Sequence, residues 1–552
     1  MSSKISGMNR ADGESQAGIK ACHTDTGGLR QLIEYLLTAV LLILCVAVPF
    51  YAKDGYHQIG NAKFEAYRRI MIGGFSVLLV MAAVYYICRM VVRKQRPRLS
   101  VTDWFVLAYL MLTGVSVVSG GFYEDALWGA FGWNMGFLSQ LSFVLLYLFV
   151  SRFGKYYRTV LAVLCQAAAV VFGIGILHRL LIDPIGFYDG LNNAQKAQFL
   201  STLGQATWYA AFLAVMLPVG VGVFLYAESG KWRILGGAYM LAGFCTLVTQ
   251  NSDSAYFALA GMFLVFLMIS CEKEETVCRL LAALTLFFAA GKGMNLLMQI
   301  QPNPKLQPDF LTELMWTSWV TWVLLTACLA GTILVGRMGS YAGSSSLQGG
   351  PGDRTCSVLY RNRWKIRRGV MSIVVGLLLV TVLVMILQNR EMLPAGLSEM
   401  LSGISYFNWS DDWGNGRGRI WKFACKVISE ESWRHRIFGV GPDCFNSYVT
   451  TYHGEEAALL WGEKLLTNAH NEWLNMLING GVLGAAAYLG IFGTAVCRFL
   501  RYRRKNMLLA GIAAAAVSYM CYDFFCYQQV LCTPFVFLLM GTGEYLVREQ
   551  EQ

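Results

Sequence analysis

The chain has 552 residues, of which 56% are hydrophobic and only 14% are charged. Soluble domains are typically ~45–50% apolar and about 25% charged, so this composition excludes a water-soluble protein of this size. Runs of about 20 apolar residues exclude a disordered chain, and the alternating ~10-residue segments of a membrane β-barrel do not occur. The net charge of +11 would suggest nucleic-acid binding in a soluble protein. In a membrane protein, lysine and arginine residues in the loops account for such a charge. We therefore expect an all-α polytopic membrane protein without a nucleic-acid partner.

The apolar runs predict about 14 transmembrane helices, because a hydrocarbon core about 30 Å thick needs roughly 20 apolar residues per crossing. The first 31 residues lack the order of a signal peptide, which predicts a cytoplasmic tail and a retained first helix. The predicted spans are residues 32–52, 70–92, 101–119, 135–151, 159–181, 206–227, 234–250, 255–271, 280–299, 315–336, 369–388, 474–498, 507–523 and 530–547. The last pair and the short pair around Asn251 are the weakest of these patterns.

Lysine and arginine gather in one alternate set of loops, including Arg93–Arg98, Arg152–Arg158 and Arg501–Lys505. The opposite loops are nearly bare of cations. The positive-inside rule therefore predicts a protein of the cytoplasmic membrane with both termini in the cytoplasm. The same assignment places the polar stretch 389–473 outside the cytoplasm and a Gly/Ser-rich linker, 340–352, inside it.

The predicted organisation has four parts. The cytoplasmic tail 1–31 and an N-terminal transmembrane region, 32–199, come first. A region 200–499 follows and carries the large outer loop, and a transmembrane pair with a short tail, 500–552, ends the chain.

The first candidate motif in the outer loop is Asn415-Gly-Arg-Gly-Arg-Ile-Trp421, which contains Arg417 and Arg419. Apolar residues from Ile420 to Ile428 recur with helical spacing and are flanked by cations. This pattern predicts a short amphipathic helix on the outer membrane surface. The alternative is a basic helix that only anchors the loop.

Two further motifs follow in the same loop. Gly439-Val-Gly441 precedes a probable helix start, where free backbone N–H groups can bind anions, although a plain turn is the commoner explanation of this pattern. His470 stands beside Asn471, just before an apolar span. An imidazole with a pKa near ~6.5 suits proton transfer to or from a hydroxyl, and the alternative is a helix-start residue without a chemical role.

The order Arg-x-x-x-Trp, Gly-x-Gly, His-Asn-x-x-Leu and Gly-Val-Leu-Gly resembles the O-antigen ligase and O-antigen polymerase superfamily. Gly204–Pro218 and Thr249–Ala255 resemble two further family segments, so the resemblance covers roughly residues 200–499. It implies a glycosyltransferase that moves glycans from undecaprenyl diphosphate to a hydroxyl acceptor outside the cytoplasm, without metal or cofactor. Arg417 matches the family arginine, with Arg419 a close rival, and His470 matches the family histidine.

The chain departs from the family at Asp253, where many members carry an arginine that would neutralise a diphosphate. Arg179 and Lys292, near the outer ends of spans, are candidate replacements, with snorkelling to the headgroups as the alternative. We expect Arg417 or Arg419 to hold the diphosphate and His470 to act as base. Trp421, Asn471, Gly439 and Gly441 complete the expected substrate-binding set.

The sequence leaves other functions open. A flippase or exporter of lipid-linked glycans can also have about fourteen spans. Such a transporter should show an internal repeat that relates the two halves of its chain, and ionisable groups near the middle of the membrane. A non-catalytic partner in a polysaccharide assembly complex is a third class. Within the enzyme class, the acceptor is a glycan, a lipid or a protein, and the expected partners are the bilayer and a glycan flippase or chain-length regulator.

Overall fold

The computed structural model describes residues 27–92, 94–302, 306–345 and 358–551. Most of the predicted N-terminal tail and the second half of the Gly/Ser-rich linker lie outside these residues. Regular structure in the described part is almost entirely helical. The strands β1 (Phe199–Leu200) and β2 (Gly204–Gln205) form one short antiparallel pair.

Each of the predicted spans coincides with a helix. Nine of the described helices are long and apolar enough to cross a membrane, and three others are apolar but shorter than 18 residues. An all-α multi-pass membrane fold is therefore confirmed, whereas the count of fourteen crossings stays a prediction. The helices are Gly27–Phe50, α2 (Ile59–Val91), α3 (Val101–Gly120), α5 (Phe137–Phe153), α6 (Tyr157–Arg179), α8 (Ala206–Tyr226), α9 (Gly230–Leu247), α10 (Ser254–Ser270), α11 (Glu274–Ile300), α13 (Trp319–Ser345), α14 (Val358–Asn389), α19 (Glu472–Tyr502), α20 (Leu508–Asp523) and α21 (Thr533–Glu551).

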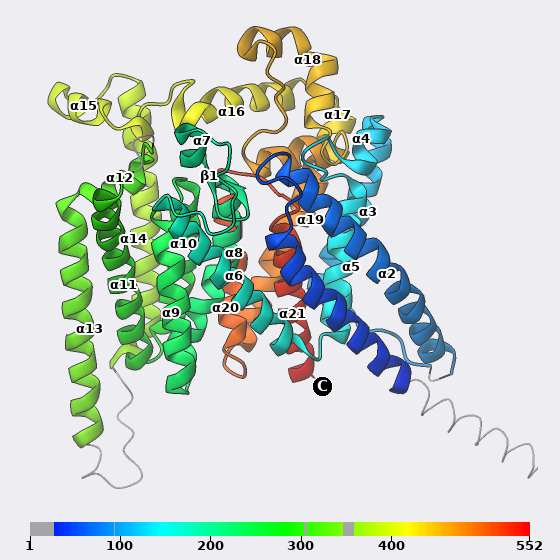
Figure 1. Ribbon diagram of the computed structural model, residues 1–552, viewed down its shortest axis with the longest axis horizontal. Coiled ribbons are helices and arrows are strands. Elements are labelled where there is room, and N and C mark those ends of the chain that lie inside the picture. Colours follow the sequence, from blue (N-terminus) through cyan, green and yellow to red (C-terminus); the bar gives the residue numbers. More distant parts are fainter. Residues whose placement is uncertain (1–26, 93, 303–305, 346–357, 552) are drawn as a thin grey trace, which may run out of the picture.

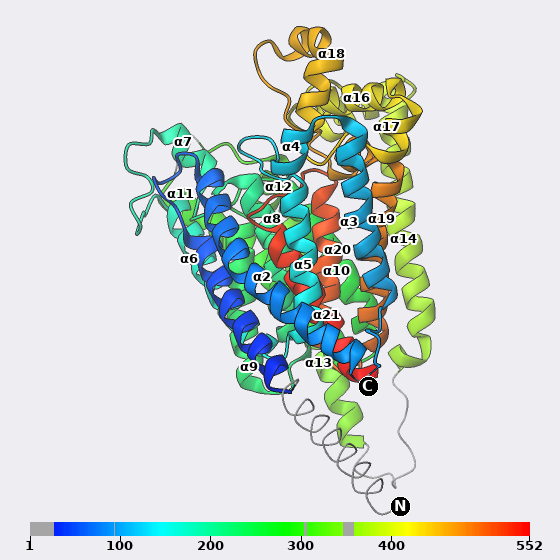
Figure 2. The same cartoon turned by 90° about the vertical axis from the view of Figure 1, so that its right-hand side faces the viewer.

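The short helices of the segment between α14 and α19 gather at one end of the bundle, which we call the loop end (Figure 1). They are α15 (Ala395–Ser402), the 3-10 turn η1 (Ser405–Phe407), α16 (Trp413–Glu430), α17 (Trp433–Phe438) and α18 (Phe445–Trp461). The start of Gly27–Phe50 and the end of α21 lie at the opposite end (Figures 1 and 2). The remaining short helices are α4 (Tyr123–Trp128), α7 (Asn193–Gln198) and α12 (Phe310–Thr317).

The core of the bundle is built on α8, α20 and α21, whose residues are buried almost throughout. Small residues let α8 and α20 approach closely: a Cβ on Gly222 would lie 3.1 Å from the Cα of Gly511. By contrast, α13 and α14 lie at the edge, and large apolar side chains such as Leu377 and Leu379 are exposed on α14. The last pair of helices, one of the two pairs that the sequence pattern marks most weakly, is therefore central to the packing.

The amphipathic pattern of the loop forms α16, as predicted, but protein covers its apolar face. Phe423, Ala424 and Val427 are at most 3% exposed and pack in a small core with Val440 and Phe445. This differs from a helix that rests on the outer membrane surface. Buried side chains from α18, α19 and the segment between α17 and α18 explain the difference, because they give the apolar stripe of α16 a protein partner.

Candidate active site

A cavity of about 1240 Å³ lies at the loop end and is lined by segments from most of the chain. Arg417 at the start of α16 and His470 just before α19 both line it. Sequence reasoning expected these two side chains to share one pocket, and the structure brings them together. The lining also includes Tyr56, Asn61, Trp208, Asp253, Asp309 and Tyr406.

Arg417 is held in the cavity wall by backbone carbonyls. It follows a kink in which Gly414, Asn415 and Gly416 all have positive φ. Its Nε donates to the carbonyl of Phe525 at 2.9 Å and its Nη1 to that of Gly414 at 2.7 Å. Within the described residues Arg417 makes no ion pair, so neutral acceptors orient the guanidinium and leave its charge available to an anion.

His470 presents an unprotonated imidazole to the same cavity. Its backbone has a φ of 49°, and its ring packs edge-on against Tyr527 with centroids 5.2 Å apart. Burial, and second the Arg417 charge, lower the His470 pKa to about 4. No described residue hydrogen-bonds to either ring nitrogen. The imidazole is therefore neutral at pH 7 and has a free lone pair that accepts a proton.

Asparagines around His470 fix its position. Asn471 caps α19, because its Oδ1 accepts the N–H groups of Trp473 and Leu474 at 2.9 and 3.1 Å. The Oδ1 of Asn468 accepts the His470 N–H at 2.9 Å. Asn471 does not line the large cavity, so its contacts are those of a helix cap that orients its neighbour.

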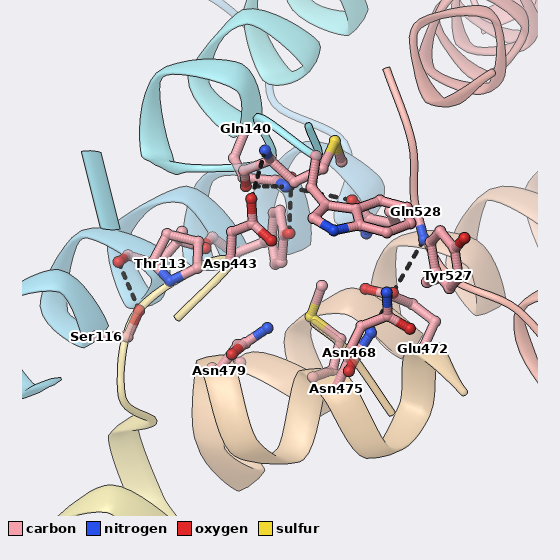
Figure 3. Close-up of a pocket in the computed structure, with 17 residues that line it drawn as sticks. Thr113, Ser116, Gln140, Asp443, Asn468, Glu472, Asn475, Asn479, Tyr527 and Gln528 are labelled. Carbon is pink, nitrogen blue, oxygen red and sulfur yellow. Dashed lines mark hydrogen bonds between the residues drawn. The ribbon is translucent and has the colours of Figure 1, made fainter. Parts of the chain in front are cut away.

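A smaller cavity of about 50 Å³ is lined by Tyr527 and by several polar side chains (Figure 3). Glu472 faces it and accepts the Gln528 N–H at 3.0 Å, which ties the start of α19 to the loop between α20 and α21. Asp443 accepts the N–H groups of Ala130 and Met135 at 2.8 and 2.9 Å. Burial raises the Asp443 pKa to about 7. This network supports the segment that carries His470.

The Gly-Val-Gly motif packs against a break in α19. Gly439 has a φ of 80° and Gly481 has a φ of 67°, and both have an extended ψ. Only glycine adopts this conformation readily. The N–H groups of Val440 and Gly441 donate to the carbonyls of Ile478 and Asn479, each at 3.0 Å. These amides are thus occupied within the protein, and the geometry favours a packing role over an anion cradle.

Carboxyl groups stand on the cavity wall that includes the turn before α10. Asp253 accepts the N–H of Leu311 at 3.0 Å and a short hydrogen bond from the Tyr406 hydroxyl. The N–H of Asp253 in turn donates to Asp309 at 3.2 Å. Burial, and second the Asp253 charge, raise the Asp309 pKa to about 6. Sequence reasoning singled out Asp253 but missed Asp309 and Tyr406, because no motif marks their loops.

The other predicted cations contact the protein rather than the cavity. Arg419 pairs with Asp411 and Asp412. Arg179 is 1% exposed and donates to the carbonyls of Ala197 and Gln250, at 2.6 and 3.0 Å. Because Ala197 lines the cavity, Arg179 supports its wall from behind.

Lys292 and Trp421 also lie outside the cavity lining. The Lys292 ammonium donates to the carbonyls of Trp316 and Ser318, at 2.7 and 2.9 Å, and thus joins α11 to the end of α12. Trp421 belongs to an aromatic cluster with Trp409, Trp413 and Phe525. None of the described residues forms a group of three or more His, Cys, Asp or Glu side chains that would hold a metal ion.

Comparison with known proteins bears on the loop segment. No curated protein matches the chain. Residues 355–489, which include Arg417 and His470, match the family described as O-antigen ligase. This match supports the resemblance of the loop segment and the start of α19 to the O-antigen ligase and polymerase superfamily.

Proposed function

We propose that the protein is a membrane glycosyltransferase that moves a glycan from undecaprenyl diphosphate to a hydroxyl acceptor on the extracytoplasmic face. The observation that carries this proposal is the presence of Arg417 and His470 on one cavity of about 1240 Å³. The cavity lies at the end of the bundle that charge distribution predicts to be outside the cytoplasm. Its size suits a diphosphate together with sugar residues.

The proposed reaction is a displacement at the anomeric carbon of the donor. The acceptor hydroxyl oxygen forms the new C–O bond while the bond from that carbon to the diphosphate oxygen breaks. His470 takes the hydroxyl proton, and Arg417 compensates the charge that remains on the leaving diphosphate. The lipid diphosphate leaves with the electron pair of the broken bond.

The carboxyl wall fits the neutral part of such a substrate. Carboxylate oxygens accept hydrogen bonds, and sugars offer several hydroxyl donors. The raised pKa of Asp309, about 6, lowers its negative charge in mildly acidic conditions and so reduces repulsion of a diphosphate. We infer that the donor lies with its diphosphate toward Arg417 and its sugar toward Asp253 and Asp309.

The test is transfer by the purified protein from a lipid-diphosphate oligosaccharide to an acceptor glycan or lipid. We expect His470→Ala to lower the rate about 10²-fold or more, the usual value of a general base. Arg417→Ala should lower it comparably, and Arg417→Lys should restore only part, because lysine cannot make bidentate contacts. Lys422→Ala is the matched control, since Lys422 pairs with Asp411 and does not line the cavity.

Two results would contradict the proposal. One is undiminished product with His470→Ala, which would remove its role as base. The other is movement of labelled lipid across liposome membranes without any glycan transfer, which would make the protein a transporter. Comparing Arg419→Ala with Arg417→Ala also decides between the two arginines, and we expect the smaller loss at Arg419.

A further inference from the structure

A second, apolar hollow of about 310 Å³ lies between α2 and α5. Its floor is formed by Tyr67, Met71 and Phe75, which are at most 4% exposed. Its rims are large side chains that remain open to the surroundings, such as Ile72 on α2 and Leu138 on α5, which are 61% and 40% exposed. Figure 2 shows α2 crossing the outer surface of the bundle in front of α5. We call this hollow the α2–α5 groove.

The groove lies next to the candidate active site on α2. Asn61 lines the cavity, whereas Phe64 and Arg68, three and seven positions further on, line the groove. Residues with this spacing lie above one another on a helix. The end of α4 and the loop after it also border both, because Trp128 lines the groove and Gly132 lines the cavity.

Apolar side chains make up most of the groove lining, in contrast to the more polar lining of the cavity. Arg68 stands near the upper end, where it pairs with Glu65 at 2.7 Å and keeps 40% of its side chain exposed. From Phe64 to Leu79 the groove follows α2 for about 22 Å, at 1.5 Å per residue. A polar cavity next to an apolar groove that runs along a membrane-spanning helix matches the shape of a molecule with an anionic head and a long hydrocarbon tail.

We propose that the α2–α5 groove holds the hydrocarbon chain of the donor lipid diphosphate while its head lies in the cavity with Arg417. This inference rests on the proposed function and names where the carrier part of the substrate binds. Lipid tails are as apolar as leucine, so leaving the bilayer for the groove gives little hydrophobic gain. The groove instead limits the positions of the chain and thereby aligns the head for reaction.

Filling the groove tests this assignment. Ser76 lines the groove on α2, whereas its neighbour Val77 is 50% exposed and does not. We expect Ser76→Trp to lower transfer from a long-chain isoprenoid diphosphate donor about tenfold. Transfer from a short-chain donor of two isoprene units should stay within twofold, because its tail ends before position 76. Val77→Trp is the matched control and should leave both rates unchanged.

The outcomes separate the two proposals. If the wild type transfers from neither donor, the proposed function fails. If the wild type transfers and Ser76→Trp has no effect on the long-chain donor, or lowers both donors equally, the groove is not the chain site and the function stands.

A direct measurement uses a long-chain isoprenoid diphosphate with a photoreactive group in mid-chain. We expect it to label peptides from 64–79 and 138–145, and Ser76→Trp to reduce that labelling. Unlabelled isoprenoid diphosphate should compete, whereas excess phosphatidylglycerol should not. Equal competition by phosphatidylglycerol would show an ordinary lipid site and overturn the proposal.

Discussion

His470 and Arg417 influence one another electrically because they line the same buried cavity. Burial makes the charged imidazole unfavourable, and the nearby guanidinium adds repulsion, so the His470 pKa falls to about 4. A group whose pKa is lowered loses its proton earlier as pH rises. The imidazole is therefore already a base from about pH 5 upward, whereas an ordinary histidine becomes one only above ~6.5.

This coupling gives a pH prediction. Transfer by the wild type should change less than about twofold between pH 5 and 7, as far as His470 controls it. In Arg417→Gln the repulsive charge is gone, so the His470 pKa should rise. Histidine-labelled protein, with His470→Ala to identify the resonance, measures both values by NMR titration. Arg419→Gln should not move the titration, and a wild-type midpoint near ~6.5 would contradict the coupling.

At the scale of single residues, the sequence could single out candidate reactive side chains but not the residues that surround them. Arg417 and His470 could be chosen because their residue types suit the reaction and their motifs stand in one loop. Asp309 and Tyr406 could not, because only folding brings their loops to Asp253. Arg179 and Lys292 look like free cations in the sequence, but in the structure they hold backbone carbonyls.

Among the elements, the glycine motifs of the loop and of α19 fit together through their backbones. A Cβ on Gly481 would lie 2.4 Å from the carbonyl carbon of Ile437 and 2.6 Å from the nitrogen of Gly439. A Cβ on Gly439 would lie 2.2 Å from the carbonyl oxygen of Asn479. Neither neighbour is a flexible side chain, so neither can move aside alone.

We therefore predict that Gly481→Ala destabilises the protein by roughly 1–3 kcal/mol, the cost of backbone strain at such a position. Gly493→Ala, on the same helix with nothing within 4 Å, should be neutral or slightly stabilising. Thermal unfolding of the purified protein in detergent measures both. Equal stability of the two variants would show that the break in α19 has other causes.

Hydropathy predicted where helices exist but not how far they extend. The predicted span 70–92 ends at the end of α2, but α2 (Ile59–Val91) begins eleven residues earlier, at Ile59. The additional turns carry polar side chains, including Lys63, which donates to the carbonyls of Val48 and Pro49 and is fully buried. A hydropathy pattern detects only apolar turns. It cannot show that backbone carbonyls will accept the hydrogen bonds of a buried lysine.

For the whole molecule, the cavity and the cationic loops lie at opposite ends. Gln205 at the start of α8 and Asn251 after α9 line the cavity, so the connection between these helices, with Lys231, lies at the far end. Because successive helices run in opposite directions through the bundle, Arg152 and Arg501 also lie far from the cavity. This separation agrees with a loop end outside the cytoplasm, which stays a prediction.

Cysteine accessibility tests this orientation. Cys425 is exposed on α16, whereas Cys444 in the same segment is buried. We predict that a membrane-impermeant maleimide labels the protein in spheroplasts, and that Cys425→Ser removes most of this label. Labelling of Cys425 only after the membrane is permeabilised would place the cavity on the cytoplasmic side and contradict the proposed donor chemistry.

The sequence could not rank the helices by their place in the bundle. Residues 507–523 and 530–547 gave the weakest pair of span predictions, yet α20 and α21 are buried almost throughout. The reason is that interior helices need not be uniformly apolar, since other helices satisfy their ionisable groups. Glu544 of α21, for example, is fully buried and pairs with Arg498 at 3.2 Å.

The hydrogen bond from Arg417 to the Phe525 carbonyl has a consequence for anyone who transplants this loop. The matching family region ends at residue 489, yet Phe525, Tyr527 and Gln528 steady Arg417, His470 and Glu472 from beyond it. A chimaera that exchanges only the family region would carry Arg417 and His470 into a host without these supporting residues. An exchange of this loop between two proteins should therefore include α20, α21 and the loop that joins them.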